Sequence, residues 1–278
     1  MTLVLITNDD GIDAPGLHRL AVAVAAAGYD VVVAAPSAEA SGSGAALTAV
    51  TEDGRIVVEK RELTDAPDLT AYAVGASPAY IALLATIGAF GAAPDLVLSG
   101  INRGANAGHA VLHSGTVGAA LTAAQSGCRA MAVSLDVLFP AAASGSDVDA
   151  AIAAFKDGQQ TRHWDTAADL AVDLLPELAG TPAGTVLNLN VPDAPPERLR
   201  GVRRGTLGGF GQVQMAVAET GEGFVRTTVA ENGDRPRPGT DVAWLADGYA
   251  CVGVVRGVVD VPDLPLRLPA DPDGAAPT

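Results

Sequence analysis

The chain has 278 residues, enough for one large domain or for a domain with an appendage. Because 49% of the residues are hydrophobic and only 4% are aromatic, the core must be built from Ala, Val and Leu, which favours tight layers of helices on a sheet. The net charge of −15 argues against binding to nucleic-acid polymers and to anionic membrane surfaces, since both would be repelled over most of the protein surface.

The amino terminus runs into an apolar strand directly after Met1-Thr2, with no basic leader and no cleavage site, which predicts a cytoplasmic protein. The longest apolar stretch, at 80–93, is interrupted by glycine and is too short to cross a bilayer. Cys128 and Cys251 have no metal-site spacing and cannot form a disulfide framework, so we expect reduced, buried thiols.

The first half of the chain alternates strand and helix patterns in the order typical of a parallel sheet. Strands are predicted at 3–6, 30–35, 56–62, 71–74, 95–99 and 130–135. Helices are predicted at 16–27, 78–90 and 116–126. They are followed by an exposed insertion at 140–164, a helix at 166–178 and a strand at 186–191. This order predicts a doubly wound α/β fold with a mostly parallel sheet.

Beyond residue 192 the sequence becomes rich in Gly and Pro and contains one hairpin pattern. Apolar and polar residues alternate from Val213 to Val217, a turn follows at 220–223, and the return strand is expected at 224–229. Such an arm has little core of its own, so it either folds back on its own sheet or packs on a second subunit. The predicted organisation is an α/β core at 1–192, a C-terminal segment with the arm at 193–268 and a disordered tail at 269–278.

Two adjacent carboxylates, Asp9 and Asp10, follow the first predicted strand. Parallel α/β sheets bind ligands at the carboxyl ends of their strands, and a carboxylate pair there suits a hard divalent cation. The alternative is structural: one Asp caps the following helix and the other is solvated in the turn. The first interpretation predicts a metal-dependent enzyme.

Glycine-rich segments at 41–44, 99–108 and 114–117 also follow predicted strand ends. The last one opens a helix, whose amino terminus suits a phosphate, and Ser or Asn oxygens beside two carboxylates suit Mg²⁺ or Mn²⁺ better than Zn²⁺. Each segment also has a plain explanation, because glycine turns the chain, Ser114 can cap a helix, and Asn side chains can satisfy backbone groups. The glycine spacings of dinucleotide-binding and P-loop proteins are absent from the sequence.

Several motifs occur in an order that is highly specific. They are TNDDG-x-x-A-P-G at 7–16, A-P-x(4)-SG at 35–42, SGINRGANAG at 99–108, SGTVGAA at 114–120, LNLNVPD at 187–193 and PGTDVAWLADGY at 238–249. Together they resemble the SurE (survival protein) family of 5'/3'-nucleotidases over most of the chain. Membership implies a Rossmann-like core, a C-terminal hairpin arm exchanged in homodimers or homotetramers, and a divalent-metal phosphomonoesterase acting on nucleoside monophosphates.

The resemblance also implies roles for individual residues. One Mg²⁺ or Mn²⁺ ion is expected at the positions that match the family's metal ligands, Asp9, Asp10, Ser41 and Asn102. The substrate phosphate is expected at Asn106, Ser114, Gly115 and Thr116. The implied catalytic set is Asp9, Asp10 and Asn106. In the implied mechanism the metal polarises a phosphoryl oxygen and activates a water, or positions an Asp for in-line attack.

The chain departs from the family pattern at four places. The usual Gly-x-Asp-Val-x-Tyr before SGTV is Gly-His-Ala-Val-Leu-His at 108–113, which removes an acid and an aromatic hydroxyl near the phosphate segment. The segments at 75–80 and 44–46 also differ, which would alter a pocket wall, and an aromatic-rich stretch is replaced at 205–212. Loss of the acid would impair ordinary turnover. Loss of the aromatic stretch would remove stacking against a nucleotide base at that position.

Four histidines and Arg103 are further polar residues that are candidates for roles at the site or in the fold. His109 and His113 either replace the lost acid–base or phosphate-binding groups or lie in an exposed loop without a role. His18 and His163 are expected to be structural. Arg103 is a candidate phosphate partner or a solvated side chain.

Three functional hypotheses remain. The first is hydrolysis of nucleoside monophosphates. The second keeps the chemistry but uses another phosphorylated small molecule, as the altered pocket segments would allow. The third is a binding protein that keeps the metal and phosphate site without turnover, and it is motivated by the lost acid.

Overall fold

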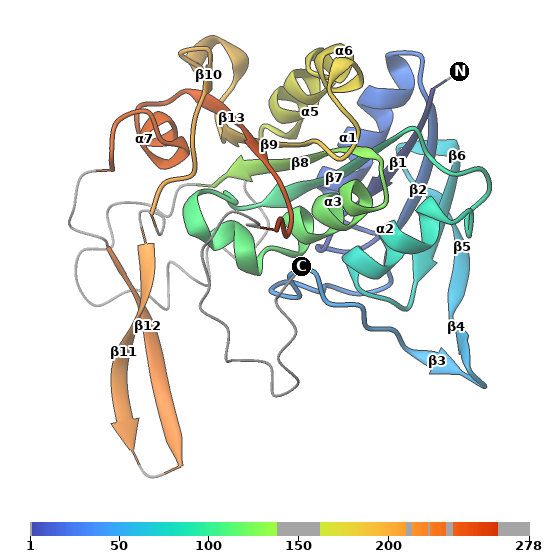
Figure 1. The fold of residues 1–278 in the computed structure, drawn as a ribbon, viewed down its shortest axis with the longest axis horizontal. Helices are drawn as coiled ribbons and strands as arrows, with labels where there is room; N and C mark the ends of the chain where they lie inside the picture. The colour runs from blue at the N-terminus through green and yellow to red at the C-terminus, as the bar shows by residue number, and fades with distance from the viewer. Residues whose placement is uncertain (1, 138–161, 210–212, 222, 232–235, 261–278) are drawn as a thin grey trace, which may run out of the picture.

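The computed structural model describes residues 2–137, 162–209, 213–221, 223–231 and 236–260. Within these residues, nine strands form one mixed, mostly parallel sheet in the order β10-β13-β9-β8-β7-β1-β2-β6-β5 (Figure 1). Their bounds are β1 Leu3–Thr7, β2 Asp30–Pro36, β5 Val58–Leu63, β6 Ala66–Val74, β7 Leu96–Arg103, β8 Arg129–Asp136, β9 Val186–Pro192, β10 Val202–Arg204 and β13 Ala250–Val255. The predicted doubly wound α/β fold is therefore confirmed.

The order of strands reverses at β1. β2 and β6 lie on one side of β1, and the chain then crosses back to place β7, β8 and β9 on the other side. β1 is parallel to both neighbours, with Val4 in register with Val31 of β2 and with Leu96 of β7. In open α/β sheets, ligands bind in the crevice at the carboxyl ends of the strands where the order reverses. The carboxyl ends of β1 and β7 are therefore the expected position of a site.

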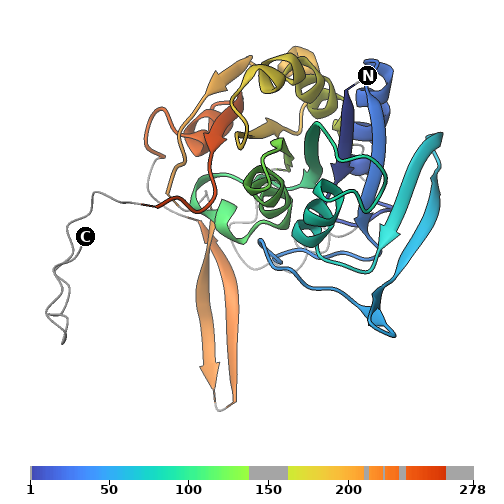
Figure 2. The ribbon, with the colours of Figure 1, turned by 45° about the vertical axis from the view of Figure 1, so that its right-hand side comes forward.

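Helices cover both faces of the sheet (Figure 2). One face carries α1 (Pro15–Ala26), α5 (Trp164–Asp173) and α6 (Leu175–Gly180), and the other carries α2 (Pro78–Thr86) and α3 (Gly115–Gln125). β1 contributes side chains to the hydrophobic core on both faces. Val4 and Ile6 pack on the α1 face and Leu5 packs on the α3 face, and all three are fully buried. Strands covered on both faces are apolar throughout, which explains the continuous hydrophobic runs in the sequence.

Two predicted helices differ from those observed. α2 ends at Thr86 rather than at Phe90, close to Gly88, whose φ of 87° lies in the left-handed region that favours glycine. The helix predicted at 166–178 is two helices, α5 and α6. Pro176 lies in the first turn of α6 and has no N–H with which to continue the hydrogen bonds of α5.

The outermost strand on the β2 side of the sheet, β5, is antiparallel rather than parallel to its neighbour. β5 pairs antiparallel with β6, and it is preceded by a short hairpin of β3 (Thr51–Glu52) and β4 (Arg55–Ile56). Most of the predicted insertion at 140–164 lies outside the described residues. Within those described, no helix has the length and apolarity needed to cross a bilayer.

The C-terminal part of the chain contributes both to the core sheet and to a projecting arm. β13 pairs antiparallel with β9, β10 pairs with β13, and α7 (Asp241–Ala246) precedes β13. β11 (Val213–Gly221) and β12 (Phe224–Glu231) form a separate two-stranded sheet that projects from the core (Figures 1 and 2). The predicted hairpin is confirmed, and its return strand extends to Glu231. The division at residue 192 stays a prediction, and the predicted tail at 269–278 lies outside the described residues.

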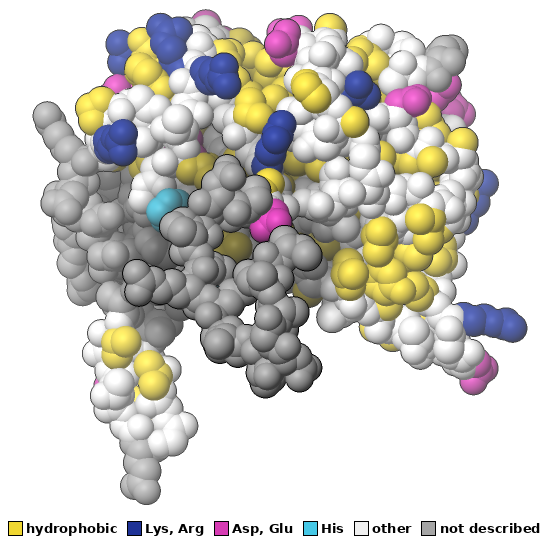
Figure 3. All heavy atoms as spheres, in the orientation of Figure 1, with side chains coloured by type: hydrophobic (Ala, Val, Ile, Leu, Met, Phe, Trp, Pro, Cys, Tyr) yellow, Lys and Arg dark blue, Asp and Glu magenta, His cyan; other side chains and the backbone are white. Residues whose placement is uncertain are grey.

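Hydrophobic side chains are exposed at two separate places on the surface. The hairpin carries exposed apolar side chains at Val217, Phe224 and Val225. On the face drawn in Figure 3, hydrophobic side chains also gather over α2, beside the β3–β4 hairpin. Both cysteines are free thiols; Cys251 is buried, as expected, whereas Cys128 is only partly buried.

Candidate active site

The loops after β1, β2 and β7 and the loop before α3 meet at one edge of the sheet around a cavity of about 460 Å³. Its lining includes the four predicted metal ligands and two predicted phosphate-binding residues, namely Asp9, Asp10, Ser41, Asn102, Asn106 and Ser114. Gly115 and Thr116 are buried in the first turn of α3. The residues singled out from the sequence therefore lie together, at the point where the strand order reverses.

A turn closed by Asn8 presents the two carboxylates. Gly11 N donates to Asn8 Oδ1 at 3.1 Å, and Asn8 Nδ2 donates to Gly11 O at 3.0 Å. Gly11 has a φ of 101°, a backbone conformation that other residues rarely adopt. α1 begins after Ala14, whose side chain makes no capping bond, so neither Asp9 nor Asp10 caps the helix. The helix-cap interpretation of this pair is therefore wrong.

The two carboxylates have few ways to neutralise their charge. Asp9 accepts a hydrogen bond from Thr116 Oγ1, and burial raises the pKa of Asp9 above its usual value. Asp10 accepts from Arg103 N at 3.2 Å, yet burial and the adjacent Asp9 charge raise the pKa of Asp10 to about 6. A divalent cation between them would offset both the burial and the repulsion, so the pair fits a metal ion.

Neutral oxygens complete the candidate metal site. Ser41 Oγ donates to Glu39 Oε1 at 2.8 Å, which leaves the lone pairs of the hydroxyl oxygen available. Asn102 Nδ2 donates to Gly104 O at 2.7 Å, which leaves the carboxamide oxygen as the acceptor. In the part of the chain that is described, no group of three or more His, Cys, Asp or Glu side chains is placed to hold a metal. Such a site therefore depends on the Ser41 and Asn102 oxygens. Glu39, which lines the same cavity, was not predicted from the sequence.

The first turn of α3 packs directly against the candidate metal site. Ser114 Oγ accepts from Val117 N at 3.1 Å, so Ser114 caps α3 while it also lines the cavity. A Cβ added at Gly115 would lie 2.7 Å from Ser43 Oγ and 2.8 Å from Asp9 Oδ2. Only glycine leaves room for Asp9 at this point, which accounts for the Ser-Gly-Thr sequence at the helix start.

Buried polar side chains of β8 and β9 hold Asn106 in place. Sequence reasoning missed these side chains. Asn106 N donates to Asn190 Oδ1 at 2.8 Å, and Asn106 O accepts from Asn188 Nδ2 at 2.8 Å and Asn190 Nδ2 at 3.1 Å. Asn106 Nδ2 donates to Ser134 Oγ at 2.9 Å. The alternation of Asn188 and Asn190 in an otherwise apolar strand was the available signal, because it places both on one face of β9.

Asn190→Ala is expected to destabilise the protein and to weaken substrate binding. The variant removes the acceptor of Asn106 N in a buried setting, which costs about 1–3 kcal/mol. Urea unfolding gives the stability, and steady-state kinetics should show a raised KM. Thr185→Val is the control, since it removes a buried hydroxyl that bonds Pro182 O away from the cavity. An unchanged KM in Asn190→Ala would contradict the role assigned to Asn190.

The chain matches one family of known proteins over most of its length. The sequence model of the family described as "Survival protein SurE" matches residues 4–212. The chain belongs to the SurE family. Membership confirms the resemblance inferred from the ordered motifs.

Individual proteins of the SurE family are also similar to this chain. A "5'-nucleotidase SurE" from Xylella fastidiosa is 36% identical over 207 residues, covering 74% of this chain and 70% of that protein. Another, from Symbiobacterium thermophilum, is 42% identical over 204 residues, covering 73% and 71%. The crystal structure of the SurE protein from Aquifex aeolicus superposes with a TM-score of 0.71 at 28% identity, covering 91% of this chain and 93% of that one.

Two of the departures from the SurE pattern face the cavity. Ala110, where the family acid is expected, and His113, where the tyrosine is expected, both line it. Arg103 lines it as well. His109 is exposed and is not part of the lining. Of the two candidate histidines, only His113 is therefore placed to contact a ligand of this SurE-family site.

The other two histidines have structural partners, as expected. His18 Nε2 lies 2.8 Å from Ile12 O, and His163 Nδ1 lies 2.9 Å from Asp193 Oδ1. Asp193 also accepts from Arg162 Nη1 at 3.1 Å. The two contacts of Asp193 join the segment before α5 to the residue that follows β9. Neither His18 nor His163 lines the cavity.

Asp136→Asn is expected to stabilise the metal-free protein at high pH. Burial and the nearby Asp193 carboxylate raise the pKa of Asp136 from 3.8 to about 6. The ionised side chain therefore costs stability above pH 6, by up to about 3 kcal/mol, and this cost disappears as both states become protonated at low pH. Urea unfolding in EDTA should show a gain at pH 8 that declines through pH 6 and is absent at pH 3.5. An equal gain at every pH would contradict the assignment.

Proposed function

We propose that the chain is a divalent-metal-dependent phosphomonoesterase that hydrolyses nucleoside monophosphates. The observation that carries the proposal is one cavity lined by the four candidate metal ligands together with Asn106 and Ser114. Carboxylates beside neutral oxygens suit a hard cation, and a helix amino terminus suits a phosphate. The name 5'-nucleotidase carried by the relatives from Xylella fastidiosa and Symbiobacterium thermophilum supports a nucleotide substrate.

The proposed metal, one Mg²⁺ or Mn²⁺ ion, would be held by oxygens of Asp9, Asp10, Ser41 and Asn102. Nucleotidases of the SurE family generally use a divalent metal. When bound, such an ion polarises a phosphoryl oxygen and lowers the pKa of a water. The chain orients its two carboxylates through donors from other segments, since Thr116 Oγ1 bonds Asp9 and Arg103 N bonds Asp10.

The substrate phosphate would be held by groups that still have hydrogens to donate. Asn106 Nδ2 uses one hydrogen on Ser134 Oγ, so its second hydrogen remains for a phosphate oxygen. Ser114 Oγ accepts from Val117 N, so its own hydrogen remains as well. The amino terminus of α3 adds partial positive charge at the same place. In the proposed mechanism these groups orient the phosphate ester, and Asp9 and Asp10 would bind the metal ion.

A second candidate is a phosphatase for another small phosphorylated molecule. It is favoured by Ala110 and His113, which give the cavity wall a different size and polarity from the family pattern. Ala110 also favours the third candidate, a binding protein without turnover, because a methyl group cannot exchange protons with the substrate.

A phosphate-release screen separates these candidates. It would cover 5'- and 3'-nucleoside monophosphates and sugar phosphates, each with Mn²⁺, with Mg²⁺ and with EDTA. The proposal predicts release from nucleoside monophosphates that EDTA abolishes. Release from sugar phosphates alone would support the second candidate, and binding without release under any metal would support the third.

We also propose that the chain forms a homodimer or homotetramer through its arm. A two-stranded hairpin is marginally stable alone in water, and this one exposes Val217, Phe224 and Val225. The net charge of −15 weighs against a nucleic-acid polymer as the partner. Light scattering after size exclusion is expected to give two or four times the chain mass of 27.8 kDa. A mass of one chain would contradict this proposal.

A further inference from the structure

The Asn106 loop, residues 104–108, is held from a second side by Asp241, the first residue of α7. Gly108 N donates to Asp241 Oδ2 at 2.8 Å. Gly208 N and Val242 N both donate to Asp241 Oδ1 at 2.8 Å. Asp241 is only 3% exposed, so backbone N–H groups from three separate segments surround a buried carboxylate. Asp241 itself does not line the candidate active-site cavity.

The same loop also touches the arm root, residues 206–209, which leads toward the projecting hairpin. His109 N, directly after the loop, donates to Gly209 O at 3.1 Å. A Cβ added at Gly108 would lie 1.9 Å from Gly209 O, and Gly108 has a φ of 59°, so the contact requires glycine. The Asn106 loop and the arm root therefore meet directly and are also bridged by Asp241.

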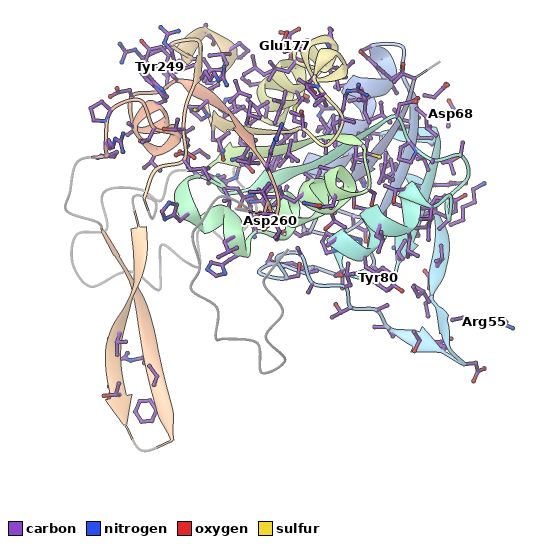
Figure 4. The ribbon with its side chains drawn as sticks, viewed as in Figure 1. Arg55, Asp68, Tyr80, Glu177, Tyr249 and Asp260 are labelled. Carbon is purple, nitrogen blue, oxygen red and sulfur yellow. The ribbon has the colours of Figure 1, made fainter. Side chains whose placement is uncertain are left out.

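α7 is itself packed in place on both sides. Val242 and Leu245 form a small apolar cluster with Ala107 of the Asn106 loop. On the outer side, Trp244 meets Tyr249 edge to face, with ring centroids 5.5 Å apart, and Figure 4 shows Tyr249 beside α7. Asp241 is therefore held at the start of a helix that packs against the Asn106 loop of the candidate active site.

We propose that Asp241 is a positioning residue that couples the arm root to the Asn106 loop and so sets how Asn106 meets the substrate phosphate. A buried carboxylate is tolerated only while its hydrogen-bond donors surround it. If the arm root moved away from the loop, either the carboxylate or Gly108 N would lose its partner. The loop, α7 and the arm root are therefore held together, and the arm root contributes to substrate binding. The kinetic part of this proposal rests on the proposed phosphatase function.

Asp241→Asn tests the coupling because it keeps the side-chain size but replaces one accepting oxygen with an NH₂ group that cannot accept. The KM of the substrate that the wild type hydrolyses is expected to rise at least about tenfold, with kcat and the Mn²⁺ Kd changed less than about twofold. Hydrogen exchange read by mass spectrometry should show peptides covering 104–113 and 206–209 losing protection together. This second readout does not depend on activity.

Thr240→Val is the matched control. Thr240 caps the same helix by accepting from Ala243 N at 3.3 Å, but it makes no bond to the Asn106 loop. It is expected to lower the Tm about as much as Asp241→Asn does while leaving KM unchanged. A rise in KM in Thr240→Val equal to that in Asp241→Asn would overturn the proposal, as would Asp241→Asn with wild-type KM and wild-type protection.

Gly208→Ala reaches the same contact from the arm side and serves if Asp241→Asn does not fold. Its added Cβ would lie 3.3 Å from Asp241 Oδ1 and 3.0 Å from Val242 Cγ2. The same rise in KM and joint loss of protection are expected, and wild-type values would overturn the coupling. If the wild-type protein releases phosphate from no substrate, the proposed function fails, while the exchange measurement still decides the coupling.

Discussion

Asp9→Asn is expected to lower kcat/KM for phosphate-ester hydrolysis by at least about 10³-fold, a loss of about 4 kcal/mol in transition-state stabilisation. The substitution removes one of two charges that would bind the metal, while Asn can still accept from Thr116 Oγ1. Burial raises the pKa of Asp9, so its carboxylate costs folding stability at neutral pH. The metal-free variant should therefore be at least as stable as the wild type. Activity and stability are expected to move in opposite directions.

Asp13→Asn is the control for this result. Asp13 lies in the same loop and loses the same charge, but its side chain is 79% exposed and bonds only weakly to Arg61 at 3.4 Å. Its kcat/KM and Mn²⁺ affinity, measured by calorimetry, are expected to match the wild type. Wild-type activity in Asp9→Asn would remove Asp9 from the proposed site.

Gly115→Ala is expected to have the next largest effect, a loss of activity of at least about 10²-fold together with weaker Mn²⁺ binding. Its methyl group would lie 2.8 Å from Asp9 Oδ2 and 2.7 Å from Ser43 Oγ. Both distances are well below van der Waals contact, so Asp9 must move away from Asp10 or α3 must shift. Calorimetric titration with Mn²⁺ and phosphate-release kinetics measure the two consequences.

Gly180→Ala is the matched control for Gly115→Ala. Gly180 ends α6 in an open position where an added Cβ meets nothing within 4 Å. It is expected to leave both activity and Mn²⁺ affinity at wild-type values. Wild-type Mn²⁺ affinity in Gly115→Ala would show that Asp9 tolerates the displacement or that it does not bind the metal.

The sheet and the composition of the cavity were predictable from the sequence because both depend on local patterns. Apolar runs covered on two faces predict parallel strands, and the carboxyl ends of parallel strands share one edge. Asp9 follows β1, Asn102 lies near the carboxyl end of β7, and the two strands are neighbours. Polar residues at these strand ends therefore had to lie close together.

The support of the site was not predictable because it depends on contacts between distant segments. Asp241 bonds Gly108 N, a backbone group that carries no side-chain signature. The alternation of Asn188 and Asn190 marks one polar face of β9, but it does not identify Asn106 as their partner. The Ser-Gly-Thr segment predicts a phosphate site, and in the structure Thr116 also donates to Asp9. The break between α5 and α6 was missed because the apolar periodicity continues through Pro176.

The central claim is that oxygens from separate loops hold one divalent cation at the carboxyl edge of the sheet. Crystals soaked in Mn²⁺, with diffraction measured at the manganese absorption edge, test it most directly. We predict an anomalous peak between the side chains of Asp9, Asp10, Ser41 and Asn102, and its loss in Asp9→Asn crystals. A wild-type map with no peak in this cavity, or a peak that persists unchanged in Asp9→Asn, would contradict the account.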